Sequence, residues 1–249
     1  DGVDDRLETG PDAALNLTRT GTVEMWFNVQ GAGDVLDFGA AAWMSLLHKG
    51  GGTSANRQYS LWLNENGRLV FASNDTNQVQ SADELIRPNE WYHVTGVMDR
   101  DHGVMRLYLN GELVGTNTIA TTNAPGSNTS LFIGDTHGDT PGPGSATRFK
   151  GSLDEVRIWN VVRTDSQIQH AYQRTVEADA QGLAAYWRFT EPEGSTFNDT
   201  ADLTANQIDE RQLQLELNLI PGVQEEDGEP IDNIASSAAH TDGRALILP

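Results

Sequence analysis

The chain has 249 residues and a formal net charge of −20, from 16 Lys and Arg against 36 Asp and Glu. This balance excludes a general nucleic-acid binder and a protein that docks on anionic lipid, because both depend on clustered basic side chains. Apolar residues make up 37% of the chain, enough for a folded core, and no apolar run approaches the ~18 residues of a membrane span. Cysteine is absent, which excludes disulfides and thiolate metal sites.

The first half of the chain alternates apolar and polar residues with a period of two, which predicts half-buried strands. One such strand spans 22–29, and its apolar residues share a face: Val23, Met25, Phe27 and Val29. A second spans 58–63, with its own shared face: Tyr59, Leu61 and Leu63. Residues 64–67 then form a turn, and a returning strand over 68–72 completes a hairpin.

Further strands follow in the second half. Residues 91–98 and 105–109 are predicted to pair across a turn at 99–103. Asn110-Gly111 then turns the chain into a strand over 112–115, since both residues tolerate positive φ. Three more strands are predicted, at 131–134, 152–159 and 182–189.

One short helix is predicted after Thr164. The residues Thr164-Asp-Ser-Gln167 form a capping box, in which a hydroxyl and an amide satisfy N–H groups at the start of a helix. Ile168 and Tyr172 then lie on one face, and the helix should end near Arg174. Many short antiparallel strands with one short helix indicate an all-β, two-sheet sandwich. Its longest loops are polar and are predicted at 50–56, 121–128 and 134–145.

Seven segments follow one another in an order typical of a known family. They are “DGVDDRLETGPDAALNLTRTGTVEMWFNV”, “LLHKGG…YSLWLNENGRLVF”, “NEWYHVTGVMD”, “MRLYLNGELVG”, “LFIGD”, “FKGSLDEVRIWN” and “GLAAYWRF”. Over roughly residues 1–190 the chain resembles bacterial laminin-G-like domains, which are jelly rolls of the concanavalin-A-like type. The resemblance implies two curved antiparallel sheets, often a bound Ca²⁺, and a binding role on a surface protein or beside a polysaccharide-degrading enzyme.

Residues 1–249 are predicted to form a single domain, in which 191–249 complete the family-like core over 1–190. Residues 212–219 alternate and are expected to be a strand. In the resembled family an apolar strand precedes the D-G-x-D-D motif, whereas here that motif stands at residue 1 and the similar strand at 243–249. We therefore expect 243–249 to supply the first strand beside the N-terminus, through a permuted arrangement or a cut from a tandem array.

No catalytic residue is predicted. The chain has neither a G-x-S-x-G nor an H-E-x-x-H motif. The E-x-D-x-E pattern that the resemblance associates with a glycosidase strand occurs at Glu225–Glu229, but this acidic segment bears Gly and Pro and is interpreted as an exposed loop. Asp154 and Glu155 are adjacent, so their side chains should point to opposite faces of a strand and cannot act as a pair.

Calcium is the cofactor that the resemblance implies. In the family, the aspartate of the G-x-[IL]-D-E-V-R-I strand meets the N-terminal segment around a structural cation. The matching residue here is Asp154, and the N-terminal ligands would be among Asp1, Gly2 and Asp4. The alternative is that Asp154 only hydrogen-bonds backbone. The sequence Asp99-x-Asp101-x-Gly103 has only two acids and is interpreted as a hairpin turn.

A sugar site needs an aromatic surface together with planar polar groups. Loop position selects the candidates Trp43, His48, Arg57, Tyr59, Asp135, His137, Asp139 and Arg148. The alternatives are that Trp43 caps the core and that the loop over 134–148 is only a mobile surface loop. The other tryptophans lie inside predicted strands, where packing is the default: Trp26, Trp62, Trp91, Trp159 and Trp187.

The leading interpretation is a non-catalytic, lectin-like module that binds a glycan or another cell-surface ligand. The alternatives are a structural or adhesive repeat of a large bacterial surface protein, and a glycosidase or polysaccharide lyase of the same fold. A chain that starts at Asp1 without a signal-peptide pattern is expected to be part of a larger multidomain protein. We expect an extracellular or cell-surface location, although a cytosolic chain could have the same composition.

Overall fold

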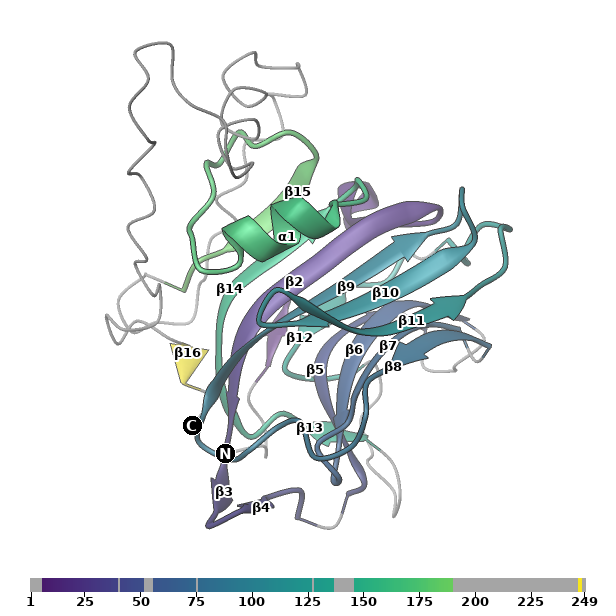
Figure 1. Cartoon of the computed structure of the whole chain (residues 1–249). Coiled ribbons are helices and arrows are strands. Elements are labelled where there is room, and N and C mark those ends of the chain that lie inside the picture. The colour runs from purple at the N-terminus through teal and green to yellow at the C-terminus, as the bar shows by residue number, and fades with distance from the viewer. Residues whose placement is uncertain are drawn as a thin grey trace, which may run out of the picture.

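The computed structural model describes residues 6–39, 41–51, 56–74, 76–126, 128–136, 146–189 and 246–247. In these residues two large β-sheets pack around a common core, and one short helix lies against the outside of one sheet (Figure 1). The expected all-β sandwich with one short helix is confirmed.

The first sheet, called the β5–β8 sheet below, has the strand order β1-β12-β5-β6-β7-β8, and β13 runs parallel to the start of β5. Its strands are β1 (Leu7–Glu8), β5 (Trp43–Gly50), β6 (Arg57–Asn64), β7 (Leu69–Ser73), β8 (Asn77–Gln80), β12 (Leu131–Ile133) and β13 (Ala146–Arg148).

The second sheet, called the β2–β14 sheet below, has the order β11-β10-β9-β2-β14-β15, with β16 paired to β14. Its strands are β2 (Thr20–Val29), β9 (Trp91–Asp99), β10 (Val104–Leu109), β11 (Glu112–Thr118), β14 (Gly151–Trp159), β15 (Leu183–Trp187) and β16 (Leu246–Ile247). A small ribbon of β3 (Gly31–Ala32) and β4 (Val35–Leu36) and a 3₁₀ turn (Ala13–Leu15) belong to neither large sheet, and Leu15 of the turn is buried in the core.

The core lies between the sheets and is formed by alternate residues of their strands. The fully buried residues of β2 and β6 include Val23, Met25, Phe27, Val29, Tyr59, Leu61 and Leu63. These are the residues that the sequence places on inward faces, so the predicted alternation is confirmed. Gly96 of β9 marks a close approach of the sheets, because a Cβ there would lie 2.5 Å from the Phe71 ring of β7.

Six strands are not among those predicted: β1, β3, β4, β5, β8 and β13. The pairing of β5 with β6 shifts register between Ser45 and Leu47 and again between Lys49 and Gly50. Such bulges insert unpaired residues and hide the period of two. The strands β8 and β13 have only four and three residues, which is too short for a pattern to be read.

The helix α1 spans Asp165–Ala171. Both hydrogen bonds of the predicted capping box are present between Thr164 and Gln167, so the predicted start is confirmed. The helix ends earlier than the expected Arg174, because Tyr172 already serves as its C-terminal cap. Ile168 is buried beneath it against Val97 and Tyr108 of the β2–β14 sheet.

The C-terminal segment is described only in part. Residues 190–245, including the strand expected over 212–219, lie outside the described residues. In β16, Leu246 pairs with Leu153 and Ile247 with Ser152, antiparallel to β14. A strand from the far end of the chain thus extends the β2–β14 sheet. The N-terminal motif at 1–5 lies outside the described residues, so its meeting with this strand stays a prediction.

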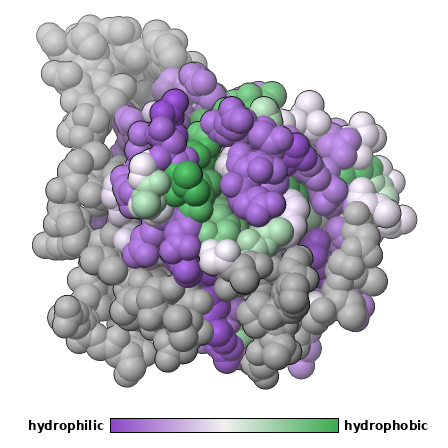
Figure 2. Space-filling view, turned by 90° about the horizontal axis from the view of Figure 1, so that it is seen from below, coloured by the Kyte–Doolittle hydropathy of each residue, from purple (hydrophilic) through white to green (hydrophobic). Residues whose placement is uncertain are grey.

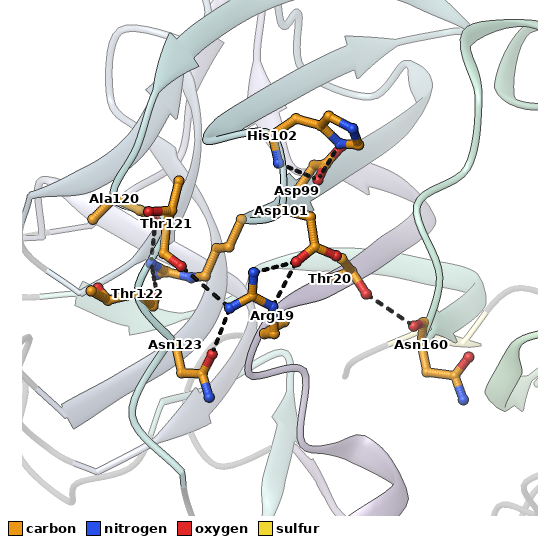
Figure 3. A network of polar contacts seen from close by, with 11 residues as sticks. Arg19, Thr20, Asp99, Asp101, His102, Ala120, Thr121, Thr122, Asn123 and Asn160 are labelled. Atoms are coloured by element: carbon orange, nitrogen blue, oxygen red, sulfur yellow. Dashed lines mark hydrogen bonds and ion pairs between the residues drawn. The ribbon is translucent and has the colours of Figure 1, made fainter.

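A polar network holds the turn between β9 and β10 against neighbouring loops (Figure 3). Arg19 donates from Nε to Asp101 Oδ1 at 2.6 Å and from Nη1 to Asn123 Oδ1 at 3.1 Å. The Asp99 carboxylate accepts the backbone N–H of His102 at 3.1 Å. The strands pair on either side, with Val104 opposite Asp99. The interpretation of this segment as a hairpin turn is confirmed, and both carboxylates bind protein groups.

The surface formed by the described residues is largely polar. Seen from below, hydrophilic side chains predominate and hydrophobic ones form small patches between them (Figure 2). The exposed large apolar side chains in the described ranges are Val35, Leu113 and Val161. Within the same ranges no helix has the length and hydropathy that crossing a membrane would require.

Candidate functional site

The outer face of the β2–β14 sheet is covered by α1 and the chain around it (Figure 1). Trp26 of β2 donates its indole N–H to the Tyr172 carbonyl at 3.1 Å, and its ring lies 6.1 Å from the Tyr172 ring. His93 of β9 packs edge-on against Trp26, with the ring centroids 5.3 Å apart. Aromatic side chains therefore close this face beneath the end of the helix.

A charged cluster is buried under the same cover. Arg157 of β14 has no exposed side-chain surface and binds Glu24 at 3.3 Å and, more closely, Glu155. Trp159 donates its indole N–H to Glu24 at 2.9 Å, and Tyr186 donates its hydroxyl to Glu155. Buried charges need such pairing, because an isolated ion in a protein interior is costly.

The electrostatics of the cluster favour the ionised form of Glu24. Burial alone would raise the pKa of Glu24, but the charges of Arg163 and Arg157 bring that pKa below its ordinary value. Burial also raises the pKa of the Tyr186 hydroxyl, to about 12. Both acids that bind Arg157 are at most 2% exposed. Their protein partners and their burial make this cluster a structural element rather than a site open to ligand.

A bulge in β14 overturns the expectation that Asp154 and Glu155 point to opposite faces. The pairing with β2 shifts register between Asp154 and Arg157, and Glu155 adopts a φ of 51°. Asp154 stands opposite Trp26, whose ring faces α1, and Glu155 binds Arg157 on that same side. The extra residue breaks the alternation, so both acids lie on the covered face. Both are buried and closed to solvent there.

The outer face of the β5–β8 sheet holds a pocket. Its volume is about 280 Å³, and the residues that line it are Trp43, Arg57, Trp62, Val70 and Gln78. They come from four neighbouring strands, β5 to β8. On β6 the inward residues are Leu61 and Leu63, so Trp62 between them points outward. The pleat of the sheet thus gathers two indole rings, an aliphatic side chain and two planar polar groups on one face.

Trp62 is the centre of this pocket's packing. The Arg57 guanidinium lies over its ring, 5.5 Å from the centroid, which fixes the planar cation against the aromatic face. On another side the His48 ring packs edge-on at 6.0 Å, and a 2.9 Å hydrogen bond joins His48 Nδ1 to Ser60 Oγ. The Trp62 indole Nε1 is buried and has no hydrogen-bond partner among the described residues. A buried donor without an acceptor is uncommon.

The predicted ligand residues fall into three groups: those at the pocket, Tyr59 in the core, and those of the loop over 134–148. The pocket brings together Trp43 and Arg57, with His48 buried behind Trp62. The expectation for Tyr59 is wrong: this residue is fully buried in the core, where its hydroxyl donates to the Leu15 carbonyl at 2.9 Å. Its place on the inward face of β6 follows from the same alternation that predicted the strand.

The loop candidates are only partly described. Asp135 is buried and its carboxylate binds Arg148 at 3.0 Å and Arg6 at 3.3 Å, so it is tied into the protein. None of these three residues is among those that line the pocket. The remaining candidates, His137 and Asp139, lie outside the described residues.

Sequence reasoning missed Trp62, Val70 and Gln78. Trp62 was assigned to packing because it lies inside a strand. The signal that identifies it was present in the sequence, since Tyr59, Leu61 and Leu63 fix the inward face and leave Trp62 on the outward one. Val70 and Gln78 become part of the pocket only through the pairing of β7 with β6 and β8.

The predicted calcium ligands are described only at Asp154. Its carboxylate accepts the backbone N–H of Glu155 at 2.8 Å, and the side chain is buried. The other expected ligands, Asp1, Gly2 and Asp4, lie outside the described residues. Among the residues that are described, no group of three or more His, Asp or Glu side chains is arranged to hold a metal ion. Calcium needs six to eight oxygens, so the predicted site would require ligands outside the described residues.

The chain matches a known protein family over more than half of its length. The family model of the concanavalin A-like lectin/glucanases superfamily matches residues 1–169. The chain belongs to this superfamily. No curated protein matches the chain.

Two solved structures illustrate how similar this chain is to known proteins in sequence and fold. A Bacteroides ovatus protein, provisionally assigned as carbohydrate binding, shares 21% identity at a TM-score of 0.59, over 82% of this chain and 54% of that one. The chain thus spans about half the length of that protein. The CBM40 module of the Ruminococcus gnavus IT-sialidase shares 17% identity at a TM-score of 0.50, over 68% of this chain and 97% of the module. At these identities the likeness shows the fold alone.

Proposed function

We propose that this concanavalin A-like domain is a non-catalytic carbohydrate-binding module and that the pocket formed by Trp43, Arg57, Trp62, Val70 and Gln78 is its binding site. The observation that carries the proposal is an aromatic-lined pocket on the sheet face that α1 leaves uncovered. Sugar rings present C–H faces that pack on indole rings, and hydroxyls that bond planar polar groups.

The lining also favours binding over hydrolysis. A glycosidase of the usual kind needs two carboxylates about 5–9 Å apart across the bond that it cleaves. The described lining contains no Asp or Glu. The acids of β14 and Glu24 lie on the other sheet, buried and engaged by Arg157. The carbohydrate-binding assignments of the Bacteroides ovatus protein and the CBM40 module, which share this fold, are consistent with a binding module.

The test is retention on a glycan array and in polysaccharide affinity gels. We expect Trp43→Ala to abolish retention, because it removes an indole wall of the pocket. Trp91→Ala is the matched control: Trp91 is also the half-buried first residue of a strand, but on the β2–β14 sheet. Retention that survives Trp43→Ala would place the sugar elsewhere. The absence of retention on any sugar would favour a structural repeat of a surface protein.

Calcium stabilisation is part of the proposal, with Asp154 and the N-terminal oxygens as ligands. A cation that binds only the folded state raises stability by mass action. We expect the melting temperature in millimolar Ca²⁺ to exceed that in EDTA, and Asp154→Asn to remove the difference. Asp101→Asn is the control, because Asp101 pairs with Arg19 in a hairpin turn. An unchanged melting temperature in the wild type would contradict the calcium site.

We further propose that the module acts outside the cell as part of a longer chain. The large negative charge and the lack of cysteine fit this location. Detection of the native protein in the secreted or surface fraction of its source cells would test it, and detection only in the cytosolic fraction would contradict it.

A further inference from the structure

The polar groups of the pocket are unevenly divided between donors and acceptors. Arg57 offers only N–H donors, the Trp62 indole offers one N–H, and the Gln78 amide offers N–H groups with a single carbonyl oxygen. No carboxylate belongs to the described lining, although the chain has 36 Asp and Glu. The described lining of the pocket is therefore rich in hydrogen-bond donors.

Two of these donors are held in place before any ligand arrives. The Arg57 guanidinium is fixed over the Trp62 ring at 5.5 Å, which leaves its fork of N–H groups with a defined plane. The Trp62 Nε1 donor is buried without an acceptor in the described structure. A fixed guanidinium pairs most strongly with a planar carboxylate, which can accept two of its N–H groups.

The size of the pocket limits the ligand to a small unit. A volume of about 280 Å³ lies just below the usual range for small-molecule pockets, which begins at about 300 Å³. The net charge of −20 disfavours a long polyanion. At physiological salt this repulsion is screened beyond about 8 Å. The electrostatic energy of a single ligand carboxylate beside Arg57 therefore depends mainly on the protein groups close to it.

We infer that the pocket binds one acidic sugar residue, a uronic acid, with its ring against Trp43 and its carboxylate on Arg57. This inference rests on the proposed function and names the ligand class of the same site. Arg57 has other contacts in the protein. Because a guanidinium carries five N–H groups, the ligand carboxylate is an additional partner rather than a replacement.

The experiment uses matched ligands that differ only at the carboxylate. Methyl glucuronide and methyl galacturonide are titrated beside methyl glucoside and methyl galactoside into protein with ¹⁵N-labelled tryptophan indoles. We expect the acidic member of at least one pair to bind tenfold or more tightly than its neutral partner. We also expect the Trp62 indole signal to shift on binding.

Variants then assign the preference to Arg57. Arg57→Gln should reduce the preference to twofold or less, while Trp43→Ala weakens binding of both members of a pair. Arg68→Gln is the control for loss of one positive charge, since Arg68 adjoins the same sheet but pairs with Asp83 at 2.8 Å. Thermal unfolding of each variant verifies that it is folded.

The outcomes separate this inference from the proposed function. Equal or tighter binding of the neutral glycosides, with shifts of the Trp62 indole signal, overturns the acidic ligand and leaves the carbohydrate site in place. A preference for the acid that survives Arg57→Gln also overturns the inference. Failure of every glycoside here overturns it as well, and failure on the glycan array in addition overturns the proposed function.

Discussion

The two outer faces of this sandwich carry the same kinds of side chain and use them differently. On the β2–β14 face, Arg157 is fully buried, bound by Glu24 and Glu155, and donates to the carbonyl of Arg174 in the segment that follows α1. On the β5–β8 face, Arg57 lies over Trp62 beside a pocket. Each face pairs an arginine with aromatic rings, and among the described residues the pocket lined by both is on the β5–β8 face.

The difference shows that cover, rather than residue type, separates a structural cluster from a binding site. Beneath α1, each charge must find a partner within the protein, because water is excluded. On the face without a helix, planar polar groups and indole rings line a cavity that a ligand can fill. The comparison predicts that equivalent substitutions will cost stability on one face and binding on the other.

The largest expected effect is on the covered face. Arg157→Met leaves two buried glutamates without their shared cation, which should lower the free energy of unfolding by about 3–5 kcal/mol. Arg57→Met, the matched change on the other face, should lower it by less than about 1 kcal/mol. Urea denaturation at neutral pH measures both. If Arg157→Met fails to fold, Arg157→Lys provides a milder test. Equal losses of unfolding free energy at the two positions would contradict the proposed difference between the two faces.

The second largest effect is a loss of stability at low pH, which arises on the covered face. Burial raises the pKa of Glu24, but Arg163 and Arg157 lower it further, so the folded-state pKa lies below the ordinary value of 4.5. The stability that this ionised group contributes is present above its unfolded pKa and is lost as the pH falls through the folded pKa. We expect the free energy of unfolding to decline below about pH 4.5.

Glu24→Gln isolates this contribution from the other acids of the chain. The variant should be less stable at pH 7 and should show a shallower decline between pH 5 and pH 3, in urea titrations at several pH values. A variant whose pH profile runs parallel to that of the wild type would show that Glu24 has no shifted titration. Retention on glycan should be unchanged, since Glu24 is on the covered face.

The smallest effect concerns the helix that makes the cover. Thr164→Ala removes the capping hydroxyl that accepts the Gln167 N–H at 3.2 Å, and should cost about 1 kcal/mol. Thr164→Ser keeps the hydroxyl and should cost little. Thermal unfolding measures both, and ligand binding in the pocket should not change. Weakened binding in Thr164→Ala would mean that the two faces are coupled.

Much of this architecture could be predicted from the sequence, and the exceptions have specific causes. The inward faces of β2 and β6 and the start of α1 follow from local patterns, because burial and capping depend on residues close in the chain. The paths of β5 and of β14 near Glu155 could not be predicted, since bulges there break the period of two. Trp62 could have been placed on the outward face, whereas the gathering of Val70 and Gln78 beside it depends on strand pairing.

The sequence by itself determined the all-β class, the inward faces and the family, because alternation, turn residues and ordered motifs are local properties of the chain. Tertiary structure alone decided which outward face is covered and which holds a pocket. Trp26 and Trp62 both stand on outward faces of alternating strands, and no local pattern separates them. Where α1 docks is settled by contacts between segments far apart in the chain, such as the bond from Trp26 to Tyr172.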